Sequence, residues 1–261
     1  MRLVTFASGS SGNCALLTLD GVHILLDAGI SWRRIRAELE RSGVRPEELS
    51  AVLITHEHSD HIAGLGTLVR NCAAPICAPR TVARHLERTV AGAAARLRVI
   101  PPGTEAALGP LRVRCFPTSH DTDESVGWRV EGSAVFALAT DTGCVTQEIL
   151  AGLRGADAVL IEANHDPDLL LSGPYPPYLK RRILSARGHL SNADCAALAG
   201  ALAESGTRQI VLGHLSRENN RPALAFRAVA AALEGTETAL CVAPAAERLT
   251  VEVEEPCLPS R

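Results

Sequence analysis

Short apolar runs, each bounded by Gly, Pro, Asp or Asn, recur along the whole chain. Runs of this kind predict buried strands, because a strand needs only a few apolar residues between two turn signals. The predicted strands cover residues 3–6, 15–19, 23–26, 51–54, 111–116, 135–139, 158–161 and 210–212, with further strands around residues 241 and 251. Several of these strands end directly in His, Asp or Glu, so we expect the polar side chains to be aimed by the ends of a sheet.

Helix patterns lie between these strands. Ser31 is a candidate N-cap for a helix that ends near Gly43, and Thr146 precedes a second helix. Ser191 opens an alanine-rich helix, and a last helix follows Pro222. Strands mixed with helices, with some tight strand-to-strand turns, predict a layered α/β protein with mixed sheets.

Length and composition limit the class of protein further. A chain of 261 residues with 46 % hydrophobic residues can bury a large core, and we expect one domain over residues 1–255 and a C-terminal tail over 256–261. No apolar run approaches the ~20 residues that span a bilayer, and the first residues lack the apolar stretch of a signal peptide. We therefore expect a cytoplasmic protein without membrane contact, whose protein partners the sequence does not indicate. The eight cysteines include no CxxC pair, which favours reduced cysteines.

The strongest chemical signal is THEHSDH at residues 55–61, directly after the strand at 51–54. It places His56, His58, Asp60 and His61 within six positions. Alternation in an extended stretch aims His56, His58 and Asp60 to one side, and a helix starting near Ile62 brings His61 to join them. Imidazole and carboxylate ligands suit zinc, and four such residues exceed one three-ligand site, so the cluster predicts two metal ions.

The HxHxDH motif resembles that of the metallo-β-lactamase-fold hydrolases. This resemblance implies a four-layer αββα sandwich with mixed sheets and one domain. It also implies that a later His completes the first metal site, that an Asp bridges the ions and that a C-terminal His completes the second site. Carried onto this chain, the first ion takes His56, His58 and His120, the second takes Asp60, His61 and His214, and the bridge is Asp141. His23 and His85 lie inside a predicted strand and helix, and we expect them to be structural.

The second half of the chain resembles the phosphodiesterase branch of these hydrolases, which includes the tRNA-processing RNase Z. In that branch a Glu after a strand orients a His that is not a primary ligand and that assists phosphodiester cleavage. Here LIEANHD and GHLSNAD supply Glu162 and His189, so with Asp60 these are the expected catalytic residues, and His165 of the first motif is a further candidate. The alternative is that Glu162 and His189 only make loop hydrogen bonds.

Three stretches resemble the bacterial YycJ family, also called WalJ or VicX. They are FASGSSGNC, EANHDPDLLLSGPYPPYLKRRILSARGHLSN and HLSRENN, and the similarity runs from Leu3 to about Leu233. The family is associated with single-strand or 5′-to-3′ DNA exonuclease activity. Pro177 departs from the bulky residue, such as Trp, expected there, but this removes no expected ligand.

The segment from Leu169 to Ala193 indicates a nucleic-acid partner independently of that resemblance. It contains no acidic residue, and its basic and tyrosine residues are Lys180, Arg181, Arg182, Arg187, Tyr175 and Tyr178. Cationic side chains suit phosphates and tyrosines stack on unpaired bases, although a solvated helix face with packed tyrosines is the alternative. In SGSSGN, Ser11 or Asn13 can contact a phosphate, and a tight turn explains the motif nearly as well.

These features predict a dinuclear phosphodiesterase, expected to be a 5′-to-3′ exonuclease of single-stranded DNA. Two cations lower the pKa of a bridging water and polarise the phosphoryl oxygen. Zn²⁺ is the first choice from the histidine-rich ligands, and Mn²⁺ is the second. One alternative is a metal-dependent hydrolase of a small-molecule ester, thioester, lactone or cyclic phosphodiester. Another is a non-catalytic binding protein with the same fold. The net charge of −3 excludes a wholesale basic coat.

Overall fold

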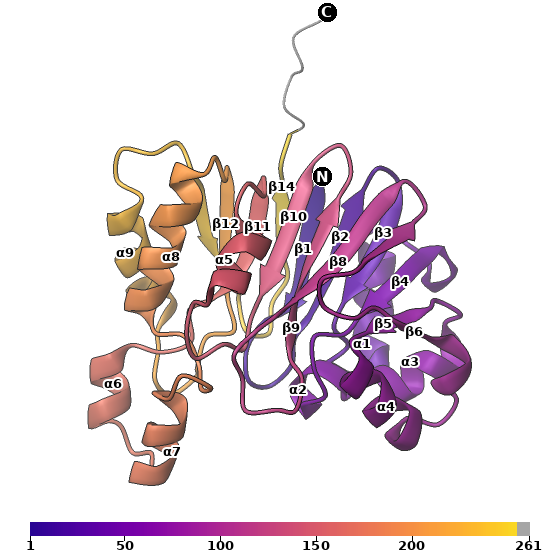
Figure 1. Cartoon of the computed structure of the whole chain (residues 1–261), viewed down its shortest axis with the longest axis horizontal. Coiled ribbons are helices and arrows are strands. Elements are labelled where there is room, and N and C mark those ends of the chain that lie inside the picture. Colours follow the sequence, from indigo (N-terminus) through magenta and orange to yellow (C-terminus); the bar gives the residue numbers. More distant parts are fainter. Residues whose placement is uncertain (255–261) are drawn as a thin grey trace, which may run out of the picture.

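Two seven-stranded sheets form the centre of the molecule (Figure 1). The computed structural model describes residues 1–254 of the 261-residue chain, so the predicted tail at 256–261 lies outside the described residues. In order across the first sheet, the strands are β14 (Leu249–Glu252), β1 (Arg2–Ala7), β2 (Cys14–Leu19), β3 (Val22–Leu26), β4 (Leu49–Leu53), β5 (Ile76–Ala78) and β6 (Leu97–Val99).

Both sheets contain parallel and antiparallel strand pairs. In order across the second sheet, the strands are β13 (Ala239–Val242), β12 (Gln209–Gly213), β11 (Ala158–Glu162), β10 (Val135–Ala139), β9 (Val126–Glu131), β8 (Leu111–Pro117) and β7 (Glu105–Leu108). Strands β10 to β13 are mutually parallel, whereas β7, β8, β9 and β10 pair antiparallel in turn. Because β8 and β10 are both antiparallel to β9, they run in the same direction and end at the same edge of the sheet.

Three separate apolar cores account for four layers. The sheets pack face to face around Leu17, Ile24, Trp128 and Phe136, all fully buried. The outer face of the first sheet is covered by α1 (Trp32–Arg41), α3 (Leu65–Asn71) and α4 (Arg80–Thr89). The outer face of the second is covered by α5 (Gln147–Leu153), α8 (Asn192–Glu204) and α9 (Pro222–Ala232). The fold is therefore the expected αββα sandwich.

Short elements complete the chain at the sheet edges. They are α2 (Ser59–Ile62), α6 (Pro167–Ser172), α7 (Pro177–Ile183), η1 (Pro46–Glu48) and η2 (Ala94–Arg96). Helices α2, α6 and α7 lie along the same edge of the molecule in Figure 1. Strands β3 and β4 are parallel and end at this edge, as do β8, β10, β11 and β12. Side chains that directly follow these strands are thereby brought together.

The predicted strands match observed strands with ends that differ by two residues at most. The helix caps agree less uniformly. Thr146 and Ser191 accept hydrogen bonds from the backbone N–H groups of Ile149 and Asp194, whereas the Ser31 side chain makes no capping bond. The last two strands do not pair with each other, because β13 joins β12 and β14 joins β1. Strands β5, β6, β7 and β9 were not expected from the apolar pattern.

The cysteines and the helix lengths can be compared with the sequence analysis within residues 1–254. The seven cysteines in this range are free, and five of them are buried as small apolar side chains. Within residues 1–254, no helix has the length and apolar character needed to cross a membrane.

Candidate metal centre

The THEHSDH stretch starts where β4 ends and runs straight into α2. The extended backbone reaches only to His58, the N-cap of α2, and the helix begins at Ser59. The expectation that Asp60 lies in the extended stretch, with a helix starting near Ile62, is therefore wrong. Asp60 and His61 occupy the first turn of the helix instead, and this turn redirects both side chains. The negative charge of Asp60 also suits the positive end of a helix, although α2 is only one turn long.

The first set of ligand-type atoms belongs to three imidazoles. The Nε2 atom of His56 lies 3.1 Å from Nδ1 of His58, which in turn lies 3.2 Å from Nε2 of His120. Two nitrogens that bind one zinc at ~2.0–2.1 Å with tetrahedral angles are about 3.4 Å apart. The three rings are thus spaced as ligands of a single ion would be.

The second set combines a carboxylate with two imidazoles. Oδ2 of Asp60 lies 3.3 Å from Nε2 of His214 and 3.4 Å from Nε2 of His61. His61 and His214 are buried, and Asp60 is mostly buried. These three residues form a second group with the spacing of metal ligands.

Asp141 stands between the two sets. Its Oδ1 lies 3.7 Å from Nε2 of His120 and 3.4 Å from Nε2 of His214, and its Oδ2 lies 3.2 Å from Nε2 of His61. The residue follows β10 with φ of 56°, an uncommon backbone conformation that aims the side chain inward. Its Oδ2 is buried yet makes no hydrogen bond among the described residues. A buried carboxylate oxygen without a hydrogen-bond donor is costly, and a bound cation would supply the missing partner.

Asp27 is a site residue that the sequence analysis missed. It follows β3, and its carboxylate accepts from Nδ1–H of His61 at 2.8 Å and from the backbone N–H of Thr55 at 2.9 Å. Because a carboxylate only accepts, the His61 proton is fixed on Nδ1 and Nε2 stays free for a ligand. The available signal was an Asp directly after an apolar strand, in LLDAG.

Close backbone packing holds α2 against the loop after β3. A Cβ on Gly29 would lie 1.6 Å from the carbonyl oxygen of Asp60, so only glycine fits at this position. The backbone N–H of Gly29 donates to the carbonyl of Asn13 at 2.8 Å. The Asn13 amide nitrogen lies 3.0 Å from Nε2 of His61 and 3.2 Å from Oδ2 of Asp60.

Glu162 connects the second ligand set with His189. Its Oε1 lies 2.7 Å from Nδ1 of His189 and 3.0 Å from Nδ1 of His214, while its Oε2 accepts from the backbone N–H of Thr142. One fully buried carboxylate therefore orients two imidazoles through their Nδ1 atoms. His214 then presents Nε2 to the ligand cluster, whereas His189 remains 22 % exposed.

The protonation of this group follows from its charges. Burial raises the pKa of Glu162, but the neighbouring His189 and His214 outweigh burial and lower it to about 2. Burial lowers the pKa of His189, and the Glu162 carboxylate reverses that effect and raises it above the usual value. His189 therefore holds a proton more readily than a free imidazole, which suits a proton donor.

Burial and neighbouring charges also shift the pKa values of the candidate metal ligands in opposite directions. Burial lowers the pKa of His214, but Asp141, Asp60 and Glu162 together raise it to about 10. Burial raises the pKa of Asp141, but His214 and His61 hold it well below its usual range. For His56, burial dominates and places the pKa well below that of free imidazole. The carboxylates are thus ionised and ready to attract cations.

The loop that carries His120 is tied to the segment before His189. Nδ1 of His120 lies 3.1 Å from the carbonyl of Gly188, so its Nε2 faces the other imidazoles. The Arg187 guanidinium donates to the carbonyls of His120 and Thr122 at 2.8 and 2.7 Å. Arg187 therefore positions a candidate ligand, a role that the sequence did not indicate.

The other expected phosphate contacts are also largely engaged with the protein itself. Lys180 donates to the carbonyl of Leu171 at 2.6 Å, and Arg182 forms an ion pair with Asp121. The Arg181 side chain is exposed and makes no hydrogen bond or ion pair with the described residues. The basic segment is therefore less open to a strand than its composition suggests.

The remaining candidates lie at different depths. Tyr178 is 68 % exposed, whereas Tyr175 is half-buried and lines the same pocket as His189. Ser11 is exposed and Asn13 is buried against α2. His165 is 1 % exposed with no hydrogen-bond partner for either ring nitrogen among residues 1–254, and it is absent from the clusters of ligand-type atoms. The structure thus brings the seven expected ligands and the Glu162–His189 pair into one centre and leaves His165 outside it.

Known proteins match this chain over most of its length. Residues 23–215 match the beta-lactamase superfamily domain. The chain is 40 % identical over 223 residues to exodeoxyribonuclease WalJ of Streptococcus pneumoniae, covering 84 % of this chain and 83 % of that protein. It is 35 % identical over 236 residues to exodeoxyribonuclease YycJ of Bacillus anthracis, covering 90 % and 89 %.

A solved structure agrees with the fold. Zn²⁺-bound PqqB from Methylobacterium extorquens superposes with a TM-score of 0.72, covering 97 % of this chain and the whole of that chain at 20 % sequence identity. At this identity the similarity supports the four-layer architecture alone.

Proposed function

Because this chain belongs to the beta-lactamase superfamily and is a metal-dependent hydrolase, we propose that it is an exodeoxyribonuclease that shortens single-stranded DNA in the 5′-to-3′ direction. The relatives WalJ and YycJ carry the name exodeoxyribonuclease, which supports DNA as the substrate. The observation that carries the proposal is the shared carboxylate of Glu162, which holds one imidazole in the ligand cluster and a second, partly exposed imidazole beside it.

The residues fit two divalent cations, and Zn²⁺ is the better match for a set with five imidazoles. We assign one ion to the three imidazoles of His56, His58 and His120, the other to Asp60, His61 and His214, and the bridging position to Asp141. Mn²⁺ is the second choice. Such ions supply Lewis acidity toward the phosphoryl oxygen and lower the pKa of water.

The chain's own residues supply the remaining steps. Asp27 and Glu162 fix the tautomers of His61 and His214, so their Nε2 atoms stay directed at the cluster. As the oxygen of water bonds to phosphorus, one O–H bond of that water breaks and its proton passes to solvent, while the bond from phosphorus to the leaving O3′ breaks. His189 gives its proton to that oxygen, and Glu162 stabilises the protonated imidazole until the transfer. The half-exposed position of Tyr175 and the free guanidinium of Arg181 leave both available to a strand.

End-labelled DNA tests this function. Protein loaded with Zn²⁺ or Mn²⁺ is incubated with single strands that carry a label at the 5′ or the 3′ end, alongside duplex DNA and a thioester. We expect the 5′ label to leave at once as a mononucleotide, while the 3′ label passes through a ladder of shortening strands. Phe226→Ala, a change on the outer helix α9, serves as the matched control and should behave like the parent protein. Preferential thioester hydrolysis, or loss of the 3′ label first, would contradict the proposal.

A further inference from the structure

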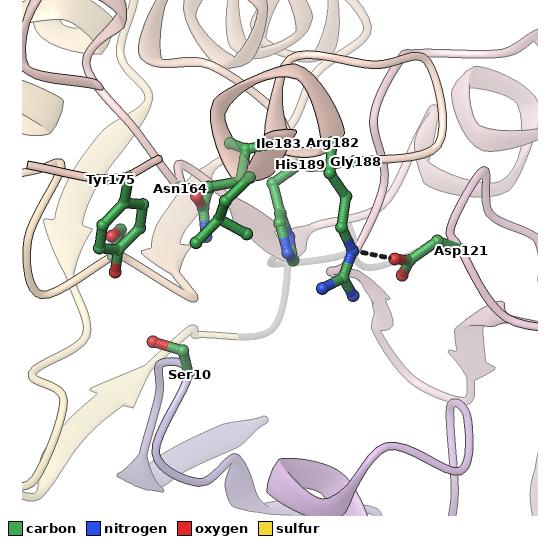
Figure 2. A pocket seen from close by; sticks show the side chains of 10 residues that line it. Ser10, Asp121, Asn164, Tyr175, Arg182, Ile183, Gly188 and His189 are labelled. Atoms are coloured by element: carbon green, nitrogen blue, oxygen red, sulfur yellow. Dashed lines mark hydrogen bonds and ion pairs between the residues drawn. The ribbon is translucent and has the colours of Figure 1, made fainter. Parts of the chain in front are cut away.

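A small pocket opens directly beside His189. It has a volume of about 170 Å³ and lies between the end of the second sheet and helix α7. Figure 2 shows His189 near its middle, Tyr175 to one side, and Arg182 with its partner Asp121 to the other. Ser10, from the connection between β1 and β2, faces them from across the pocket. The pocket therefore borders the imidazole that the proposed mechanism assigns to the leaving oxygen.

We propose that this pocket binds the base of the nucleotide that leaves the strand, with Tyr175 as its stacking surface. This inference rests on the proposed function, and it adds a binding subsite for the departing nucleotide. During cleavage the leaving O3′ lies next to His189, so the nucleotide attached to that oxygen must occupy the space on the same side. The pocket is the space that the structure offers there.

The dimensions of the pocket suit one base. Clefts for drug-sized ligands measure roughly 300–1,000 Å³, so a volume of about 170 Å³ admits a single ring system and excludes a stacked pair of nucleotides. One base in the pocket at a time matches the release of mononucleotides, since a second nucleotide on the leaving side has no room beside the first.

The lining of the pocket has the mixed character that a base requires. Leu179 and Ile183 of α7 supply apolar surface next to the ring of Tyr175. Asn164 and the hydroxyl-bearing Ser10 supply polar groups on the other walls. The amide nitrogen of Asn164 donates to the carbonyl of His214 at 3.0 Å, which ties this wall to the ligand cluster. Arg182 and His189 line the same pocket, and an aromatic ring combined with cationic groups is typical of sites that stack bases without reading their sequence.

Tyr175 is held in place by the local chain. It lies between Pro174 and Pro176, whose fixed φ angles reduce the freedom of the loop between α6 and α7. The bond from Lys180 to the carbonyl of Leu171 ties α7 to the end of α6. A stacking ring that is already ordered loses little conformational entropy when a base binds.

Nucleotide binding to the metal-loaded protein tests the pocket without any DNA cleavage. Isothermal titration compares deoxyadenosine 5′-monophosphate with deoxyribose 5-phosphate, which lacks only the base. Stacking on one aromatic ring is worth ~1–3 kcal/mol, so we expect the nucleotide to bind about 5- to 150-fold more tightly. Tyr175→Ala should remove most of this difference, and Tyr175→Phe should keep it because the ring remains.

Phe226→Ala is the matched control, because it also truncates an aromatic side chain, 42 % exposed, but on α9 outside the pocket. Equal affinity for the two ligands, or an unchanged nucleotide affinity in Tyr175→Ala, would overturn the pocket assignment and leave the exonuclease proposal intact. Failure to degrade DNA would overturn the exonuclease proposal and the identity of the leaving nucleotide, whereas the titration still decides whether the pocket takes a base.

Discussion

The carboxylate of Glu162 lies 2.7 Å from Nδ1 of His189, and the pair connects the ligand cluster to the pocket beside it. The same oxygen lies 3.0 Å from Nδ1 of His214. A change at Glu162 is therefore expected to affect both proton donation by His189 and metal binding by His214. A change at either histidine alone is expected to affect only one of these.

Glu162→Gln keeps the shape of the side chain and removes its charge. We expect a loss of about 10–100-fold in metal affinity or activity, as is typical when a residue that orients a ligand is changed. Because the carboxylate raises the pKa of His189, its loss lowers that pKa. The reaction needs protonated His189, so the alkaline limb of the pH profile of kcat should move to lower pH in Glu162→Gln. An alkaline limb that stays in place or moves upward would contradict this role.

Asp60→Ala is expected to empty the second metal site and abolish activity. Asp60 supplies the only carboxylate of that set, apart from the bridging position assigned to Asp141. Elemental analysis of purified protein should find about one ion per chain instead of two. Glu87→Ala, which removes an exposed carboxylate on α4, provides the control and should retain both ions. An active Asp60→Ala protein with two ions would refute the assignment.

Asp27→Asn tests the residue that fixes the tautomer of His61. An asparagine amide nitrogen can donate, so it no longer enforces a proton on Nδ1 of His61. We expect metal affinity to fall about 10–100-fold, with the folded state retained. Competition with a chelator, followed by metal analysis, measures this loss, and affinity equal to the parent's would show that Asp27 only supports the loop.

Metal affinity is expected to rise with pH. Without a cation, His214 titrates with a pKa of about 10, and the pKa of His61 is also well above the usual value. Without a cation, both rings are therefore imidazolium ions at neutral pH, with a proton on each nitrogen. The proton on Nε2 must leave before that nitrogen can bind a metal, so it competes with the metal. Affinity for Zn²⁺ should increase from pH 6 to pH 9, with proton release visible in titrations in different buffers. A flat profile would contradict the proposed involvement of these two residues as ligands.

The sequence predicts that the ligand-type side chains come together, and the reason is physical. In His56, His120, Asp141 and His214, a ligand-type side chain comes directly or within a few residues after a strand, and the strand directions place these ends at one edge. Asp27 obeys the same rule, but its short LLDAG motif reads equally well as a turn. Asp60 differs from the pattern's prediction because the backbone turns into a helix at Ser59, three residues earlier than the pattern indicates.

The basic segment shows what a local pattern cannot reveal. Arg182 pairs with Asp121, which lies 61 positions away, and Arg187 binds the carbonyl of His120, 67 positions away. Such partners depend on how α7 packs against the loop after β8, so composition alone cannot distinguish a free guanidinium from an engaged one. The same packing leaves Tyr175 half-buried and Tyr178 exposed.

In the proposed function, His189 is a proton donor and not a metal ligand. His189 lies in one group of ligand-type atoms with Asp141, Glu162 and His214, but Glu162 engages its Nδ1 and we assign it to neither ion. His189→Ala should therefore keep both metal ions. DNA cleavage should slow by ~10²–10⁴-fold, the usual effect of losing a positioned acid or base.

The most direct measurement compares the parent protein with His189→Ala on DNA and on a nitrophenyl phosphodiester, whose leaving group needs no proton, with metal content measured on the same samples. We predict a large loss of rate on DNA, a much smaller loss on the nitrophenyl substrate and two ions per chain. Equal losses on both substrates, or the disappearance of one ion, would contradict the assignment of His189 as the proton donor.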